Sequence, residues 1–369
     1  MTNSPQLEAL RDGRLWEEFC DTLKEAGKAV LRPGSPDDDF DRAEGYRYLS
    51  RLTRLALEKY VEHADPTAPT LYELSHATAK IGIDNPDSAY LNATISGEHE
   101  YTIRGRRGEE PYLSFGVYYG HYGQDGPMGC SGYLEDDDIA YDADGAFELT
   151  LSRRPATSNW LEMRPDSHLL VVRRNHLDRG NERPTEFTIE RTDAPGPPAP
   201  LDPQWLSGAL MAAARYVGGT AGFFCDWAED WAANPNELRG LPDEIKVGAH
   251  GDPNLFMIMG YWELADDEAL VIEFEPPECP YWNLEICNHW LESLDYRYHR
   301  IDLNKHSAEP DERGRITAVV AHRDPGVPNW LETAGHRRGT MGMRWAKAAE
   351  HPIPSTRVVS VDDLETRPG

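Results

Sequence analysis

The residues best suited to chemistry lie in the run YWNLEICNHWLES, residues 281–293. If this run is a β-strand, alternate side chains share one face of the sheet. That face would carry, in order, Trp282, Leu284, Ile286, Asn288, Trp290 and Glu292. An amide and a carboxylate would then end an apolar, aromatic surface. A carboxylate desolvated against tryptophan has a raised pKa, which suits a general acid or base.

The predicted site combines this strand with polar residues elsewhere in the chain. The residues that we assign to it are Glu292, His121 and His299 as catalytic groups, and Trp282, Asn288, Trp290 and Tyr119 as substrate-binding groups. In this hypothesis Glu292 is the acid or base, a histidine is its complement, and Asn288 orients the substrate. The alternative is that Asn288 and Glu292 hydrogen-bond to backbone or arginine groups at the rim of a sandwich, as most buried polar groups do.

Motifs for metals and nucleotides are missing from the sequence. The thirteen histidines include no HExxH pattern, and neither a Walker A loop nor a GxGxxG fingerprint is present. The sequence therefore predicts no metal site and no cofactor. The Asp-Ala-Asp-Gly run at 142–145 could begin a calcium loop, but we predict a hairpin turn because its repeat counterpart carries Arg313.

An internal repeat organises the chain. The sequences SNWLE at 158–162 and PNWLE at 328–332 lie 170 positions apart. Upstream of these motifs a shift of 169 aligns Ile103, Pro111 and Tyr112 with Ile272, Pro280 and Tyr281, and downstream a shift of 170 pairs Arg174 with Arg344. The repeat indicates a diverged tandem duplication.

Each copy alternates short β-branched and aromatic runs with turns, which is typical of antiparallel sheets. We predict a mainly β fold with helical additions (α+β), built from two duplicated antiparallel β-sandwich or jelly-roll-like repeats. The predicted divisions are a helical region at 1–88, repeat 1 at 89–193, a Pro-rich linker and helical connector at 194–250, and repeat 2 at 251–369. Whether the repeats form separate sandwiches or one continuous sandwich stays open.

Two smaller patterns bear on how the copies meet. Arg104 and Arg106 of the first copy correspond to Glu273 and Glu275 of the second, which indicates either pseudo-twofold packing of the copies or surface drift. The segment 81–90 places two aspartates around an Asn-Pro pair. These aspartates either cap a turn or present carboxylates at the mouth of a pocket.

Composition limits the classes of partner. Thirty-seven Lys and Arg residues against sixty-four Asp and Glu residues give a net charge of −27, which repels nucleic acids and anionic membranes. The N-terminus lacks the pattern of a secretion signal, and the five cysteines show no CxxC pair. We therefore expect a cytoplasmic protein whose partner is a small-molecule ligand rather than nucleic acid or membrane. The oligomeric state is left open.

The segments IGIDNPDSAY, YTIRG, the SNWLE and PNWLE loops, FTIER and DPGVPNWLETAGHRRGTMGMRW together resemble a bacterial family, the domain-of-unknown-function family twelve-fourteen, whose members are often actinobacterial. The resemblance covers most of the chain, and the stretch from Asp324 to Gly339 is its most specific part. It implies a β-rich sandwich fold and no assigned reaction. Trp282, Asn288, Trp290, Glu292 and Asn304 also match the pattern of the family.

The sequence thus leaves two functions from different classes. The first is a cofactor-independent acid–base enzyme, such as a lyase, isomerase or hydrolase, that acts on a small molecule with a large apolar part. The second is a protein that binds a carbohydrate or lipid-like ligand without catalysis. An enclosed cavity with convergent polar groups favours the first, and exposed tryptophans on a flat face favour carbohydrate binding.

Overall fold

The computed structural model describes residues 5–121, 128–194, 196–248 and 250–365. Strands of the first copy are β1 (Tyr72–Ser75), β2 (Ser88–Thr94), β3 (Tyr101–Arg106), β4 (Tyr112–Tyr119), β5 (Gly129–Glu135), β6 (Ala146–Ser152), β7 (Trp160–Glu162), β8 (Ser167–Asn175) and β9 (Glu186–Arg191). Strands of the second copy are β10 (Glu237–Gly240), β11 (Leu255–Glu263), β12 (Glu268–Phe274), β13 (Tyr281–Ile286), β14 (Asp302–Asn304), β15 (Ile316–Ala321), β16 (Trp330–Glu332), β17 (Arg338–Ala346) and β18 (Ser355–Ser360).

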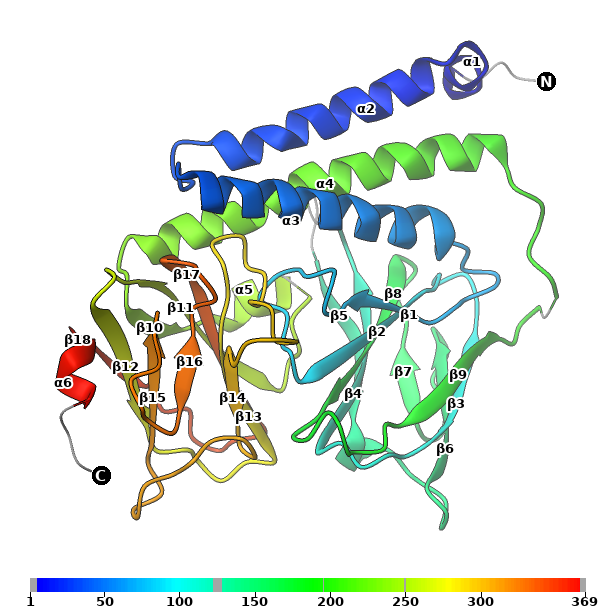
Figure 1. Cartoon of the computed structure of the whole chain (residues 1–369). Coiled ribbons are helices and arrows are strands. Elements are labelled where there is room, and N and C mark those ends of the chain that lie inside the picture. The colour runs from blue at the N-terminus through cyan, green and yellow to red at the C-terminus, as the bar shows by residue number, and fades with distance from the viewer. Residues whose placement is uncertain (1–4, 122–127, 195, 249, 366–369) are drawn as a thin grey trace.

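The two copies have the same sheet topology, as the repeat predicts. In the first copy the sheet β1-β2-β8-β4-β5 packs on the sheet β7-β6-β3-β9. In the second, β10-β11-β17-β13-β14 packs on β16-β15-β12-β18, so each strand has its counterpart in the same place. The two sheet pairs, which we call the first and second sandwich, stand side by side in Figure 1. The mainly β fold with two duplicated sandwiches is therefore confirmed.

Strand register confirms most of the sequence alignment and corrects one pair. Ile103 lies opposite Leu149 and Ile272 opposite Ala318, which agrees with a shift of 169. After β7 and β16, which carry the Trp-Leu-Glu motifs, the shift is 171. The loop after β16 is one residue longer than the loop after β7, which increases the shift from 170. The residue opposite Ser114 is Arg173, and the residue opposite Asn283 is Arg344. Arg344 therefore corresponds to Arg173, and the predicted pairing with Arg174 is wrong by one position.

Each sandwich encloses its own hydrophobic core. Phe115 and Val172 of the first sandwich meet Leu149 across the two sheets. The second core is richer in aromatic rings, and Trp282 packs edge-on against Phe274 and more loosely against Trp345. The two cores are separate, so the question of one continuous sandwich is answered. The hairpins predicted at Gly145 and Gly314 are present, and both glycines have a positive φ of about 80°.

The long alternating strand predicted over 281–293 is wrong in its second half. β13 ends at Ile286, and the chain then turns back on itself, with Leu291 at a φ of 58°. The amide oxygen of Asn288 accepts hydrogen bonds from the backbone N–H groups of Trp290 and Glu292, which fixes the turn in place of a strand. The three polar and aromatic residues after Ile286 therefore do not share a sheet face with Trp282.

The helices of residues 5–57 and 203–232 lie along one side of both sandwiches (Figure 1). The helices are α1 (Pro5–Asp12), α2 (Arg14–Ala26), α3 (Asp39–Leu57), α4 (Pro203–Ala232), α5 (Asp243–Gly248) and α6 (Val361–Glu365), with shorter turns η1 (Gly27–Leu31), η2 (Glu58–Glu62) and η3 (Asp136–Asp138). α4 follows the Pro-rich linker, and the carboxylate of Asp202 caps its start by accepting a hydrogen bond from the backbone N–H of Gln204. This helix extends over both sandwiches, so it can form a roof for any space between them.

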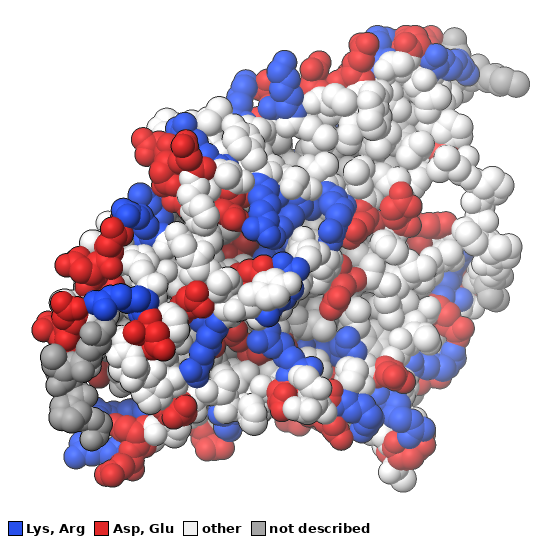
Figure 2. All heavy atoms as spheres, in the orientation of Figure 1, with Lys and Arg blue, Asp and Glu red and all other residues white. Residues whose placement is uncertain are grey.

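The charged surface does not join the copies. Basic and acidic side chains are interspersed over the face shown in Figure 2. Arg104 pairs with Glu148 on the adjacent strand of its own sheet, and Glu273 pairs with Arg357 in the same way. The contrast between Arg104 and Glu273 therefore lies on the outer sheets and plays no part in the contact of the copies. No helix in the described part of the chain is long and apolar enough to cross a membrane.

Candidate functional site

Two equivalent turns lock the sandwiches together. One is the segment 83–87, which leads into β2, and the other is 250–254, which leads into β11. Their first residues, Ile83 and His250, have φ values of 57° and 54°, a backbone conformation that non-glycine residues seldom adopt. Both turns contain proline, at positions 86 and 253, and both are closed by a hydrogen bond from a backbone N–H to the side chain two residues earlier.

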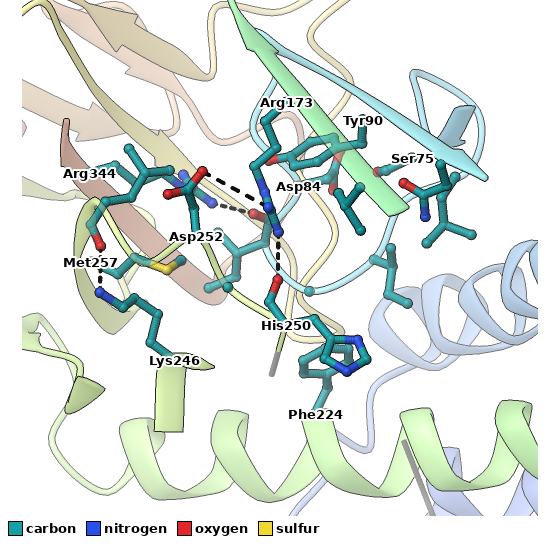
Figure 3. Close-up of a pocket in the computed structure, with 18 of the residues that line it drawn as sticks. Ser75, Asp84, Tyr90, Arg173, Phe224, Lys246, His250, Asp252, Met257 and Arg344 are labelled. Atoms are coloured by element: carbon teal, nitrogen blue, oxygen red, sulfur yellow. Dashed lines mark hydrogen bonds and ion pairs between the residues drawn. The ribbon is translucent and has the colours of Figure 1, made fainter. Parts of the chain in front are cut away.

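Each turn is held by an arginine of the opposite sandwich. Arg344 of β17 donates to the carbonyl oxygen of Ile83, and Arg173 of β8 donates to the carbonyl oxygen of His250 at 2.5 Å. Both arginines are buried. The contacts are reciprocal, so the pseudo-twofold arrangement of the copies rests on this pair of arginines. Figure 3 shows the two guanidinium groups beside Asp252.

A second set of hydrogen bonds between the two sandwiches follows the same pseudo-twofold symmetry. Asn85 donates to the hydroxyl of Tyr281 at 2.7 Å, and the hydroxyl of Tyr112, which is the counterpart of Tyr281, donates to Asp252 at 2.8 Å. Asp252 also accepts a hydrogen bond from Ser114 at 2.6 Å. Hydrogen-bonded polar groups therefore fill the outer faces of the two five-stranded sheets where they meet.

A cavity lies between the sandwiches, beneath α4, with a volume of about 150 Å³. Its lining combines Leu74, Ser75, Tyr90, Asn92, Leu169, Val171 and Arg173 of the first sandwich with Leu255, Met257, Met259 and Arg344 of the second, and with Lys59, Ile81, Gly82, Ile83, Asp84, Tyr216, Phe224, Trp227, Leu241, Lys246, His250, Gly251 and Asp252. Figure 3 shows the labelled members of this set, with Phe224 rising from α4. We call this space the central cavity.

The two sheets make unlike walls for the central cavity. Tyr90 pairs with Arg173 in the first sandwich, as Met257 pairs with Arg344 in the second. By the same register Asn92 of the first wall corresponds to Met259. One wall is therefore polar where its counterpart is apolar. The Oδ1 atom of Asn92 is buried and accepts no hydrogen bond from the described residues.

Most basic groups of the central cavity have ion-pair partners. Arg344 pairs with Glu285, Lys246 pairs with Asp243, and the guanidinium of Arg173 lies 4.0 Å from Asp252. Lys59 of η2 is different, because no described carboxylate forms an ion pair with it. Its ammonium lies 5.2 Å from the ring centroid of Tyr216, and burial lowers the pKa of the amine to about 8.

Three neutral histidines lie near Lys59. Burial, followed by the charge of Lys59, lowers the pKa of His121 to about 4 and that of His250 to about 3. Burial and His121 lower the pKa of His168, whose ring is stacked on that of His121 at 3.8 Å. These rings therefore add no positive charge at neutral pH. Among the described residues, no group of three or more His, Cys, Asp or Glu could hold a metal ion.

The predicted tryptophans lie in two different cores. Trp282 belongs to the core of the second sandwich and is 3% exposed. Trp290 lies among the helices, where its indole N–H donates to the carbonyl oxygen of Asp41 at 2.9 Å and its ring is stacked over Tyr48. The structure therefore does not bring these two rings together as one wall.

Asn288 and Glu292 are both paired. The amide of Asn288 donates to the carboxylate of Glu292 at 3.0 Å, and Arg51 of α3 forms an ion pair with the same carboxylate at 2.8 Å. Burial raises the pKa of Glu292 and Arg51 lowers it. A pocket of about 240 Å³ borders this turn, and Arg51, Asn288 and His299 all line it.

The remaining predicted residues are spread over both sandwiches. His299 pairs with Glu332 at 2.9 Å, and it also lines a polar pocket of about 350 Å³ together with Asp87. Tyr119, at the end of β4, lies under the guanidinium of Arg164 at 3.8 Å. His121 contacts the hydroxyl of Tyr60 through Nδ1 at 3.3 Å. Asn288 and His299 thus share a pocket, whereas Tyr119 and His121 lie in the first sandwich.

The segment 81–90 forms a turn, but Asn85 rather than an aspartate closes it, and the two aspartates line pockets. Asn85 closes the turn, while Asp84 lines the central cavity and accepts hydrogen bonds from the N–H and hydroxyl of Ser293. Burial raises the pKa of Asp87 to about 7, and the neighbouring charge of Asp302 adds to the increase. Asp84 therefore borders the central cavity, whereas Asp87 borders the polar pocket that His299 also lines.

The opposite face of β13, the turn at 250–254 and its equivalence to the predicted turn at 81–90 did not emerge from the sequence alone. Tyr281, Asn283 and Glu285 alternate with the apolar residues of the core and are all buried against the first sandwich. A strand face with polar residues is ordinarily exposed to solvent. The alternating pattern alone therefore does not reveal that this face is buried between the two sandwiches. The Asn85-Pro86 and Asp252-Pro253 pairs, 167 positions apart, were the available signal.

Comparison with known proteins identifies the family without a function. The family model described as protein of unknown function (DUF1214) matches residues 87–176, within the first copy and outside the stretch from Asp324 to Gly339. No curated protein matches the sequence. A crystal structure of an uncharacterized protein from Burkholderia cenocepacia is 47% identical, with 96% of this chain and 99% of that chain covered and a TM-score of 0.94.

A further structure is more distant. The VPA0106 protein from Vibrio parahaemolyticus is 14% identical, with 92% of this chain and 100% of that chain covered and a TM-score of 0.49. The sequence resemblance to the family is confirmed by the family model. This chain belongs to the DUF1214 family of proteins of unknown function.

Proposed function

We propose that this protein binds a small molecule with a large apolar part in the central cavity. The observation that carries the proposal is the pair of unlike walls. Met257 and Met259 offer an adaptable apolar surface, whereas Tyr90 and Asn92 offer polar atoms on the opposite side. A ligand with an apolar body and one polar end matches both walls, and such cavities are the usual form of small-molecule sites.

The volume limits the ligand. An apolar cavity of about 150 Å³ holds a molecule the size of benzene, and the central cavity has about this volume. A single ring or a short chain therefore fits without rearrangement. The buried Oδ1 of Asn92 receives no hydrogen bond from the described residues, so this wall still has a polar atom available inside the cavity.

Binding of an uncharged probe tests the proposal. Toluene should bind and raise the melting temperature, because a ligand that binds only the folded state stabilises it. Val171→Phe places a ring in the cavity and should weaken toluene binding at least tenfold. Val358→Phe, on a surface strand of the second sandwich, is the matched control and should leave binding unchanged. Equal binding by the wild type and Val171→Phe would refute the site.

Fluorescence gives a second readout of the same binding. Trp227 lines the central cavity, whereas Trp231, one turn further along α4, does not. Toluene should change the emission of the wild type and of Trp231→Phe, and the change should be lost in Trp227→Phe. A change that persists in Trp227→Phe would place the ligand elsewhere.

Acid–base catalysis is the second candidate function. It is favoured by the pocket that Asn288 and His299 share, because Glu292 lies behind this pocket with a pKa raised by burial. Opening of the ion pair with Arg51 would expose the carboxylate to a substrate. For any compound that the protein converts, Glu292→Gln should abolish turnover, while Asp295→Asn, on the same pocket, should retain it. Unchanged turnover in Glu292→Gln would exclude this mechanism.

A further inference from the structure

Lys59 lies where an ammonium ion is unfavourable. It belongs to η2, the π-helical turn that continues α3, and only 7% of the residue is exposed. Its ammonium faces the rings of Tyr60 and Tyr216 at 5.5 and 5.2 Å from their centroids. Aromatic faces attract a cation, but they compensate only part of the hydration that burial removes.

The surroundings of Lys59 provide no counter-charge within the described chain. The other lysine and arginine side chains of the central cavity each have a carboxylate partner, as described above. The nearby histidines are neutral, so they neither repel an anion nor add a second positive charge. Among the described residues that line the central cavity, Lys59 is therefore the cation whose charge has no carboxylate partner.

We propose that the ligand of the central cavity is a monocarboxylate, whose carboxylate pairs with Lys59 while its ring or short chain packs between Val171 and Met257. This inference rests on the proposed binding function and names the chemical class of the ligand. A carboxylate would supply the missing partner and form a charge-assisted hydrogen bond in a desolvated setting, where such bonds are strong.

A single negative charge fits better than a phosphate. One lysine compensates one charge, and a phosphate monoester would bring nearly two into the cavity. The second charge would remain buried without a partner, which is unfavourable. Phosphate-binding sites also use several backbone N–H groups or arginines together, whereas both arginines of the central cavity are engaged with Glu285, Asp252 and the two turns.

The test compares two probes of equal shape, benzoate and benzamide. The wild type at pH 7 should bind benzoate at least tenfold more tightly than benzamide by calorimetric titration. Lys59→Met should lose this preference and retain its affinity for benzamide. Lys28→Met, which changes an exposed lysine of η1, should behave like the wild type. Equal affinities in the wild type, or a preference that persists in Lys59→Met, would overturn the proposal.

The pH dependence tests the same pair without a substitution. Above the pKa of Lys59, the affinity for benzoate should fall about tenfold for each pH unit, and the affinity for benzamide should stay constant. A benzoate affinity that is flat from pH 7 to pH 10 would contradict the role of Lys59. If toluene, benzamide and benzoate all fail to bind, the proposed function itself fails. If only the preference for benzoate is missing, the carboxylate inference alone fails.

Discussion

The two sandwiches share a fold and differ where they meet. Their strands follow the same order, and the register of the arginine strands is conserved across the repeat. The inward faces of both are apolar. The outward faces have diverged, so that Tyr90 and Asn92 oppose Met257 and Met259 across one cavity. After duplication, the cores maintain the fold while the unequal outer faces give the cavity between the sandwiches two different walls.

The arginine contacts differ in the same way. Arg344 has its carboxylate partner, Glu285, on the neighbouring strand of its own sheet. The first sandwich has Gly116 at the position equivalent to Glu285, because an added Cβ there would lie 2.5 Å from the ring of Tyr118. Arg173 instead contacts Asp252 of the opposite turn at 4.0 Å and the hydroxyl of Tyr118 at 2.8 Å. Arg344 of the second sandwich is therefore held more tightly than Arg173 of the first.

The largest effect is expected at Arg344. Arg344→Met leaves Glu285 buried without its cation, and breaking a buried pair in this way costs about 3–5 kcal/mol. Arg173→Met should cost about 1–3 kcal/mol, because Asp252 keeps its hydrogen bonds from Tyr112 and Ser114. Urea denaturation of both variants measures the difference. Equal losses would show that the two contacts are equivalent after all.

A gain in stability is expected at Lys59. Its folded-state pKa of about 8 lies below the ordinary 10.5 of a lysine, so the charged amine destabilises the fold by about 3 kcal/mol at pH 7. Between pH 8 and 10.5 the Lys59 amine is protonated in the unfolded state but not in the folded state. The free energy of unfolding of the wild type therefore increases as the pH rises through this range. Lys59→Met should be more stable than the wild type at pH 7, and the advantage should disappear by pH 10.5. A constant difference across this range would contradict the burial of the charge.

A smaller effect tests the divergence at Gly116. Gly116→Ala should destabilise by about 1–3 kcal/mol, since Tyr118 cannot shift without loosening its hydrogen bond to Arg173. Gly208→Ala is the control, because a Cβ on this exposed position of α4 meets no atom within 4 Å. The control should be neutral or stabilising by up to about 1 kcal/mol. A thermal melt in which Gly116→Ala matches the wild type would refute the steric difference between the copies.

Much of the fold followed from local pattern. The alternation at Trp282 and Leu284 correctly predicted a core strand, and the Trp-Leu-Glu motifs revealed the duplication. The alternation was extended too far past Ile286, because hydrophobic period cannot distinguish a strand from a turn fixed by the side chain of Asn288. The sequence also could not show that Arg344 corresponds to Arg173 rather than to Arg174. One additional residue in a loop changes the alignment by one position without altering the pattern of the strands on either side.

The candidate site was much less predictable. Lys59 stands in the sequence among charged residues, where a helix pattern places it in solvent. Its burial comes from Tyr216, more than 150 positions later, on a helix that packs across η2. Asp84 and Asp87 were noted as possible pocket residues, but only the tertiary contact with Ser293 and Tyr281 decides which space each one borders.

The central claim is that the cavity between the two sandwiches is a ligand site with Lys59 at its polar end. A crystal of the protein soaked with 4-bromobenzoate tests it most directly, because the anomalous signal of bromine locates the ring independently of the refinement. The account predicts bromine between Val171 and Met257, with the carboxylate within hydrogen-bonding distance of Lys59. Bromine in the pocket beside Arg51 and Asn288 instead, with the central cavity empty, would contradict it.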